Sequence, residues 1–138
     1  MQNPDLDCTT VVLPSAGKGK GLFARMDIRE GEVVARMLRP RRMKRSEVES
    51  YLDQHPLLPH DCVIYVPRSS LVFFDYSWLG ARPPKWYRLN HSSQPNCAPR
   101  ILDNTVPPRE QEIAWVATRD VPAFSELAFC YEDAPAEW

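Results

Sequence analysis

The sequence lacks a long hydrophobic run, an excess of charge of either sign, and a signal-peptide pattern in its first residues. No stretch approaches the ~20 consecutive apolar residues that cross a bilayer, and Met1–Asp5 has neither the charged nor the apolar region of a signal peptide. The 17 Lys and Arg residues nearly balance the 18 Asp and Glu residues, whereas domains that bind duplex nucleic acid usually carry a clear basic excess. We therefore expect a soluble, intracellular protein with no membrane partner, and we disfavour a nucleic-acid-binding domain.

Closely spaced cysteines are missing as well. The 4 cysteines are Cys8, Cys62, Cys97 and Cys130, and none belongs to a Cys-x-x-Cys pair of the kind that holds structural zinc. We therefore expect no metal site, and an intracellular chain would keep these thiols reduced. A scattered cysteine is most often a small buried hydrophobic residue.

Proline, by contrast, is abundant, with 14 among 138 residues, about twice the usual share of ~5%. The length allows one modest core, so we expect a single domain over residues 1–138. Many prolines and short apolar runs indicate short strands joined by turns, and hence a mostly β fold with a few short helices. The expected strands are Thr9–Leu13, which Pro14 should end, Gly21–Ala24, Val33–Ala35, Cys62–Val66, Leu71–Phe74, Ile113–Ala117 and Leu127–Phe129.

One segment has a convincing helical pattern. Ser46 can cap its start, with Glu49 three residues later as in a capping box, and the helix must end before His55–Pro56. A second short helix is expected to begin at Pro83–Pro84 and to end near Leu89.

Two segments are hard to explain as scaffolding alone. Leu89–Cys97 places a dense set of polar side chains after an aromatic and apolar stretch, although a capped turn would account for many such loops. Ser15–Ala24 holds 3 of the 5 glycines, which let the backbone approach a bound molecule closely. A turn between strands is the plain alternative, and a phosphate-binding loop is disfavoured because no Gly-Lys-Ser/Thr ending and no helix pattern follow.

Taken in order, these segments resemble the SET-domain lysine methyltransferases. The family's Gly-x-Gly-Leu/Val-Phe-Ala is matched by Gly19–Ala24, and its Asn-His-Ser-x-x-Pro-Asn-Cys is matched without a gap by Asn90–Cys97. Its Glu-Leu-x-Phe-x-Tyr is matched by Glu126–Tyr131. The resemblance extends from about Val11 to Glu132, and its eight-residue central motif is the most specific part.

The resemblance implies a fold of small curved sheets with a C-terminal pseudoknot, in which the last strand threads beneath the loop at Asn90. It also implies S-adenosylmethionine as methyl donor, with the substrate lysine entering from the opposite face. The expected donor contacts are the backbone of Lys20, Gly21 and Leu22 and the residues Asn90 and His91. Tyr131 matches the catalytic tyrosine.

Methyl transfer from a sulfonium is an in-line displacement, which depends mainly on alignment and electrostatics. A free lysine has a pKa near ~10.4 and must lose its proton before it reacts. We expect the donor's positive charge and an apolar channel to lower that pKa without a dedicated base.

Further residues are expected around the substrate lysine. In the family, Phe at the position of Phe129 leaves room for more than one methyl group, which predicts a di- or trimethylated product, although Phe129 could equally be a core residue. Tyr65 and Tyr76 are candidates for the channel wall, with the core as the alternative. They lie in a variable insert, about residues 38–86, that helps to select the substrate.

Some residues depart from the family pattern. Phe124 and Ser125 replace a usual Gly-Glu, so the turn there is expected to take another form, or Phe124 to cover an apolar surface. Tyr87 stands where the family often has Arg. Without a cysteine-rich zinc segment after the tyrosine, Ala134–Trp138 is expected to form the lid, and Trp138 either stacks on the donor's adenine or is a frayed end.

The charged residues are unevenly distributed. A basic run spans residues 36–45, for which a solvated face is favoured over contact with nucleic acid or a nuclear-import signal. The run contains Arg36, Arg39, Arg41, Arg42, Lys44 and Arg45. The acidic residues around the matched tyrosine predict a rim that favours a basic peptide such as a histone tail, and hence a nuclear protein. They are Glu126, Glu132, Asp133 and Glu137.

Two other functions remain open on sequence grounds. The same fold could serve as a catalytically inactive module that binds a peptide or partner, although the presence of Asn90, His91 and Tyr131 argues against this. A cysteine hydrolase that uses Cys97 and His91 is the other reading, but no oxyanion-hole pattern supports it.

Overall fold

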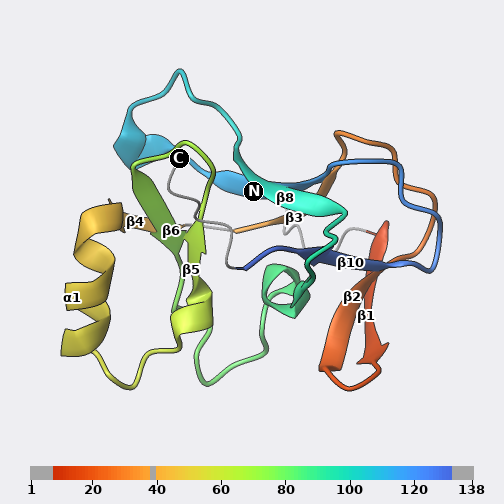
Figure 1. Cartoon of the computed structure of the whole chain (residues 1–138), viewed down its shortest axis with the longest axis horizontal. Coiled ribbons are helices and arrows are strands. Elements are labelled where there is room, and N and C mark those ends of the chain that lie inside the picture. The colour runs from red at the N-terminus through yellow and green to blue at the C-terminus, as the bar shows by residue number, and fades with distance from the viewer. Residues whose placement is uncertain (1–7, 38–39, 132–138) are drawn as a thin grey trace.

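The computed structural model describes residues 8–37 and 40–131, which fold into short strands grouped in small sheets (Figure 1). In this part of the chain the elements are β1 (Thr10–Ser15), β2 (Gly19–Ala24), β3 (Val33–Arg36), β4 (Arg41–Lys44), α1 (Val48–Gln54), β5 (Val63–Tyr65), β6 (Leu71–Phe74), β7 (Asn90–His91), β8 (Cys97–Ile101), β9 (Ile113–Ala117) and β10 (Glu126–Phe129). The strand orders are β1-β2-β10-β7, β3-β9-β8 and β4-β6-β5. This is the mostly β architecture that the sequence predicts.

The hairpin of β1 and β2 carries the glycine-rich segment. Its strands pair antiparallel from Thr10 opposite Ala24 to Ser15 opposite Gly19. The prediction that Pro14 ends the first strand is wrong. β1 is an edge strand, where a residue without a backbone N–H is tolerated because no neighbour needs that donor.

The core lies where the sheets meet and is built around β9. Trp115 is fully buried there and stacks on Trp86, with ring centroids 5.6 Å apart. Trp115 also meets the edge of Phe129 at 5.6 Å. Since Phe129 lies on β10, this packing fixes the strand that leads to Tyr131.

The second predicted helix, from Pro83–Pro84, is a tighter 3₁₀ turn over Lys85–Arg88. It presents the buried Trp86 to the core.

The insert forms a small sheet of its own, covered by α1 at one side of the molecule (Figure 1). The helix packs Val48 and Leu52 against Phe74 of β6. Ser46 does not cap it, contrary to the prediction, because a 3₁₀ turn precedes α1 and Glu47 Oε1 accepts the backbone N–H of Lys44 at 3.2 Å. Among the described residues, no helix has the length and apolar character that a membrane span requires.

Two arginines of the basic run are tied into the fold, whereas its other described members, Arg36, Arg41 and Lys44, are exposed. β4 pairs with β6, and the guanidinium of Arg42 donates hydrogen bonds to the carbonyls of Gln111 and Pro40. Arg45 lies over the Tyr65 ring at 4.9 Å. The interpretation as a solvated face is therefore wrong for these two arginines, because their apolar stems and donors are used in packing. Arg39 lies outside the described residues.

Phe124 stands in the turn before β10 with a φ of 69°. A glycine, which the resemblance leads one to expect at this position, would adopt this left-handed backbone without strain. The side chain is 77% exposed, so it does not cover an apolar surface of the described chain. A β-carbon in this conformation costs about 1–2 kcal/mol.

Replacing Phe124 by Gly should therefore raise the free energy of unfolding by about 0.5–1 kcal/mol, since the relief of strain exceeds the added entropy of the unfolded chain. Urea unfolding monitored by tryptophan fluorescence measures the change. Phe124→Ala is the matched control, because it removes the ring but keeps the β-carbon, and it should leave stability nearly unchanged. A loss of stability in the glycine variant would contradict the prediction.

Candidate active site

The loop from Asn90 to Cys97 holds strand β10 from both edges. On one edge, β7 runs parallel to β10, and the N–H of Ser92 donates to the carbonyl of Phe129 at 3.1 Å. On the other edge, the N–H of Asn96 donates to the carbonyl of Ala128 at 3.1 Å. Successive strand residues direct their polar groups to opposite edges, so β10 passes between the two limbs of the loop. This is the threading that the resemblance implies.

The threaded strand brings a polar cluster together beside the glycine-rich hairpin. Asn90 Nδ2 donates to the carbonyl of Lys20 at 3.1 Å and to Glu126 Oε2 at 2.8 Å. Ser15 Oγ donates to Glu126 Oε1 at 2.9 Å. Sequence reasoning placed Glu126 in an acidic rim, but its carboxylate is bound inside this cluster. The matched Glu-Leu-x-Phe-x-Tyr motif was a signal for Glu126, whereas no local pattern marks Ser15.

The residues expected to contact the methyl donor lie next to this cluster, and they differ in how deeply they are buried. A β-carbon on Gly21 would overlap the carboxylate of Glu126 and come within 3.0 Å of Asn90 Nδ2. Leu22 is fully buried and pairs with Leu127 of β10. Lys18 Nζ donates to the carbonyl of His91 at 3.4 Å, which draws the hairpin loop to the same site.

Gly21→Ala should weaken donor binding by about tenfold, or ~1.4 kcal/mol. The added methyl group would push Glu126 away from its hydrogen bonds to Ser15 and Asn90. Isothermal titration with S-adenosylmethionine measures the change. The other glycines of the described residues have a positive φ and would be strained by a β-carbon, so Glu49→Ala, an exposed substitution on α1, serves as the control. Equal affinity of the Gly21 variant and the wild type would contradict the assignment.

These residues fit a cationic methyl donor. An ammonium group only donates hydrogen bonds, and the hairpin side offers acceptors in the carbonyl of Lys20, the carboxylate of Glu126 and the side-chain oxygen of Asn90. Because the amide nitrogen of Asn90 is used by Lys20 and Glu126, its oxygen is the atom that would meet the donor's ammonium. Trp138, the candidate for stacking on the adenine, lies outside the described residues, as does the expected lid.

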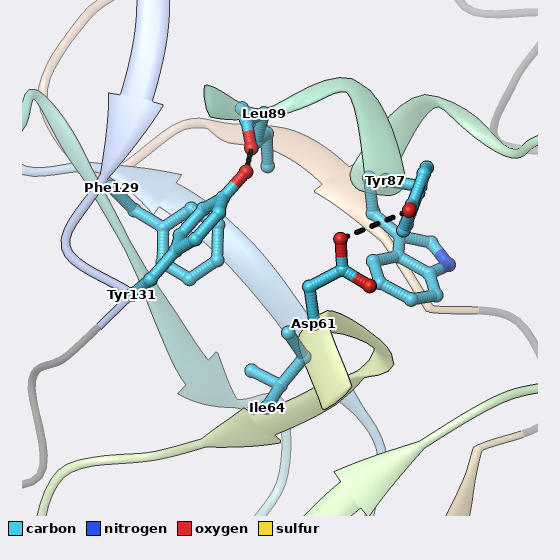
Figure 2. A pocket seen from close by; sticks show the side chains of 7 residues that line it. Asp61, Ile64, Tyr87, Leu89, Phe129 and Tyr131 are labelled. Atoms are coloured by element: carbon cyan, nitrogen blue, oxygen red, sulfur yellow. Dashed lines mark hydrogen bonds between the residues drawn. The ribbon is translucent and has the colours of Figure 1, made fainter. Parts of the chain in front are cut away.

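Tyr131 is tied to the loop at both ends of the residue. Its backbone N–H donates to His91 Nδ1 at 2.9 Å, and its hydroxyl donates to the carbonyl of Leu89 (Figure 2). Burial, followed by the negative charge of Asp61, raises the pKa of its phenol to about 12. The phenol is therefore protonated at neutral pH and acts as a hydrogen-bond donor rather than as a base.

A cavity of about 250 Å³ opens beside Tyr131. Its walls include the predicted channel residues Phe129 and Tyr65, together with His60 and Asp61. This volume is below the ~300–1,000 Å³ of typical small-molecule pockets, and it suits one extended side chain. A narrower hollow with shared walls adjoins it and reaches Leu89 and Tyr87 (Figure 2).

Two expectations about this channel need correction. Tyr76 does not line either hollow, since it packs against the core and its hydroxyl donates to the carbonyl of Pro59 at 2.9 Å. The channel is also not wholly apolar, because Asp61 brings a carboxylate into its wall. Sequence reasoning missed Asp61 and His60, which follow Pro59 in a loop with no motif.

The cysteine-hydrolase reading is excluded by the surroundings of Cys97. The residue is 0% exposed, and its thiol donates to the carbonyl of Ala128 at 3.2 Å. Burial raises the pKa of the thiol to about 12, so it is not a nucleophile at neutral pH. Within residues 8–37 and 40–131, no three or more His, Cys, Asp or Glu side chains converge to hold a metal ion.

Comparison with known proteins agrees with this geometry. A family model described as SET domain matches residues 19–132, a span that contains the hairpin strand β2, the Asn90–Cys97 loop and the strand leading to Tyr131. No curated protein sequence matches the chain. The family generally uses S-adenosylmethionine to methylate lysine. With most of its length matched and the threaded loop in place, the chain belongs to the SET-domain family.

Proposed function

We propose that this chain is an active protein-lysine N-methyltransferase, which transfers a methyl group from S-adenosylmethionine to a lysine of a histone tail in the nucleus. The observation that carries the proposal is the position of Tyr131. Its backbone is bound to His91 on the expected donor side, and its ring lines the cavity expected to take the lysine. One residue thus contacts both halves of the site.

When bound, the donor supplies a methyl group on a positively charged sulfur, and the chain's residues align the amine with it. The carbonyl of Leu89, which accepts the Tyr131 hydroxyl, would line the path between the two. Carbonyl oxygens can hold a polarised methyl group through weak C–H···O contacts. After losing its proton to solvent, the lysine amine would attack the methyl carbon, so that the N–C bond forms as the S–C bond breaks. The thioether would leave with the electron pair, and the positive charge would pass to the methylated nitrogen.

The charge and size of the cavity support this substrate class. Asp61 in its wall and a volume near 250 Å³ favour one long cationic side chain. A basic histone tail offers such side chains in an extended segment, and the acidic residues Glu132 and Asp133 follow Tyr131 in the sequence. Phe129 in the wall favours a di- or trimethylated product, as its motif position suggests.

Incubation with S-adenosylmethionine carrying a labelled methyl group, followed by mass spectrometry of core histones, tests the proposal. We expect label on a lysine of a tail peptide, with dimethyl or trimethyl product at exhaustion, and no label when that lysine is replaced by Arg. Binding of the donor without transfer to any histone would instead support the inactive peptide-binding module. Exhausted reactions that contain only monomethyl-lysine would contradict the product assignment alone.

A further inference from the structure

Asp61 has no role in the reaction described so far, although it lies in the wall of both hollows beside Tyr131. It belongs to the 3₁₀ turn His60–Cys62, directly before β5. Figure 2 shows its carboxylate between Tyr131 and Tyr87, across the hollow from the carbonyl of Leu89. Among the described residues that line the larger cavity, His60 is the other chargeable side chain besides Tyr65 and Tyr131.

The exposed carboxylate of Asp61 accepts a hydrogen bond, and the chain on either side of it is anchored. The hydroxyl of Tyr87 donates to Asp61 Oδ2 at 2.9 Å. Two residues before Asp61, the carbonyl of Pro59 accepts a hydrogen bond from Tyr76, and the residue after it, Cys62, is fully buried. A carboxylate can accept about four hydrogen bonds, so the bond from Tyr87 leaves capacity for a further donor. The position is therefore fixed, while part of the acceptor capacity remains for a ligand.

The negative charge of Asp61 affects the pKa values of two neighbouring phenols, those of Tyr131 and Tyr87. It contributes, after burial, to the raised pKa of Tyr131, and its hydrogen bond and charge contribute to that of Tyr87. A negative charge that disfavours ionisation of a nearby phenol attracts a cation at the same place. Apart from His60, whose imidazole can carry a positive charge, the remaining walls hold no cationic side chain, as at Ile64 and Phe129.

We propose that Asp61 is a substrate-specificity residue, whose carboxylate draws the ε-ammonium of the incoming lysine into the cavity and sets its position beside Tyr131. This inference rests on the proposed methyltransferase function. The Asp61 carboxylate distinguishes lysine from uncharged side chains of similar length, because these would leave it without a cationic partner. An approaching ammonium gains a charge-assisted hydrogen bond, which is stronger than a bond between neutral groups.

The carboxylate acts on binding rather than on transfer. It favours the charged lysine and so opposes loss of the proton, but it also stabilises the positive charge that develops on nitrogen during the displacement, and these two effects on the chemical step oppose each other. A loss of Asp61 should therefore appear in KM for the peptide, with kcat nearly unchanged. This split separates the proposed role from damage to the alignment of the site, which would lower kcat.

The test measures steady-state kinetics of Asp61→Asn on a synthetic peptide of the best-methylated histone tail. We expect KM for the peptide to rise about five- to tenfold, as for a charged contact in a partly open site, and kcat to stay within about twofold of the wild-type value. Asp53→Asn is the matched control, since this exposed carboxylate lies on α1 and lines neither hollow. Its KM should equal that of the wild type.

A binding measurement tests the inference independently of turnover. The wild-type protein should bind the lysine peptide about five- to tenfold more tightly than the same peptide with norleucine, which lacks the ammonium. Asp61→Asn should lose most of that preference. Transfer by the wild type together with an unchanged KM in Asp61→Asn would overturn the inference and leave the proposed function intact. A wild type that does not prefer lysine to norleucine would overturn it as well. Absence of transfer in every assay would count against the proposed function instead.

Discussion

Replacing Tyr131 by Phe is expected to lower kcat by about 100- to 1,000-fold, the range found when one preorganised hydrogen-bond donor is removed from a reaction centre. The hydroxyl binds the carbonyl of Leu89, and its loss frees that carbonyl beside the path of the methyl group. The ring remains, so its contacts with His91 at 5.4 Å and Phe129 at 4.8 Å should persist. The effect should therefore fall on the chemical step rather than on folding.

Single-turnover methyl transfer, combined with donor titration, measures this change. The dissociation constant for S-adenosylmethionine should stay within about twofold of the wild-type value, since the bond from the Tyr131 backbone to His91 is kept. Tyr51→Phe serves as control, because that tyrosine lies on α1, packs against the core of the insert and lines neither hollow. A Tyr131→Phe enzyme that keeps more than a tenth of the wild-type rate would contradict the assigned role.

The strands that the sequence predicts best are those with β-branched and aromatic runs. Leu71–Phe74 and Ile113–Ala117 have the predicted bounds, because such side chains favour a half-buried strand whatever their partner. β4 and β8 were not predicted. β4 is a run of basic residues, and β8 contains Pro99, so neither has a strand pattern of its own. Each forms a strand because it pairs with a neighbour of higher β propensity, β4 with β6 and β8 with β9.

The residues of the site also differ in whether a local sequence pattern marks them. Asn90, His91 and Tyr131 were found because each belongs to a motif whose order along the chain is specific. Asp61 and Ser15 were missed because each acquires its role only when distant segments meet, Asp61 with Tyr87 and Ser15 with Glu126. Tyr76 was misplaced for the same reason, since an aromatic residue in an insert can face the core or the channel, and only the packing decides.

Replacing Asn96 by Ala is expected to lower the free energy of unfolding by about 2–5 kcal/mol, since each buried polar group left unpaired costs about 1–3 kcal/mol. Asn96 Nδ2 donates to the carbonyl of Glu126 at 2.9 Å, and Asn96 Oδ1 accepts the N–H of Ala128 at 2.9 Å. Both partners belong to the backbone of β10, and the Asn96 side chain is buried. The loss is a large part of the ~5–15 kcal/mol that stabilises a typical domain.

Urea unfolding measures the loss, and hydrogen exchange locates it. The amide of Ala128 should exchange faster in Asn96→Ala, because its acceptor is the oxygen that the substitution removes. Gln94→Ala is the control, since Gln94 is an exposed side chain of the same loop and its replacement should change stability by less than about 0.5 kcal/mol. If Asn96→Ala unfolded like the wild type and left the Ala128 amide protected, the side chain of Asn96 would not be what holds this edge of β10. The strand would then depend on the bonds that alanine keeps, from the backbone N–H of residue 96 and the thiol of Cys97 to the carbonyl of Ala128.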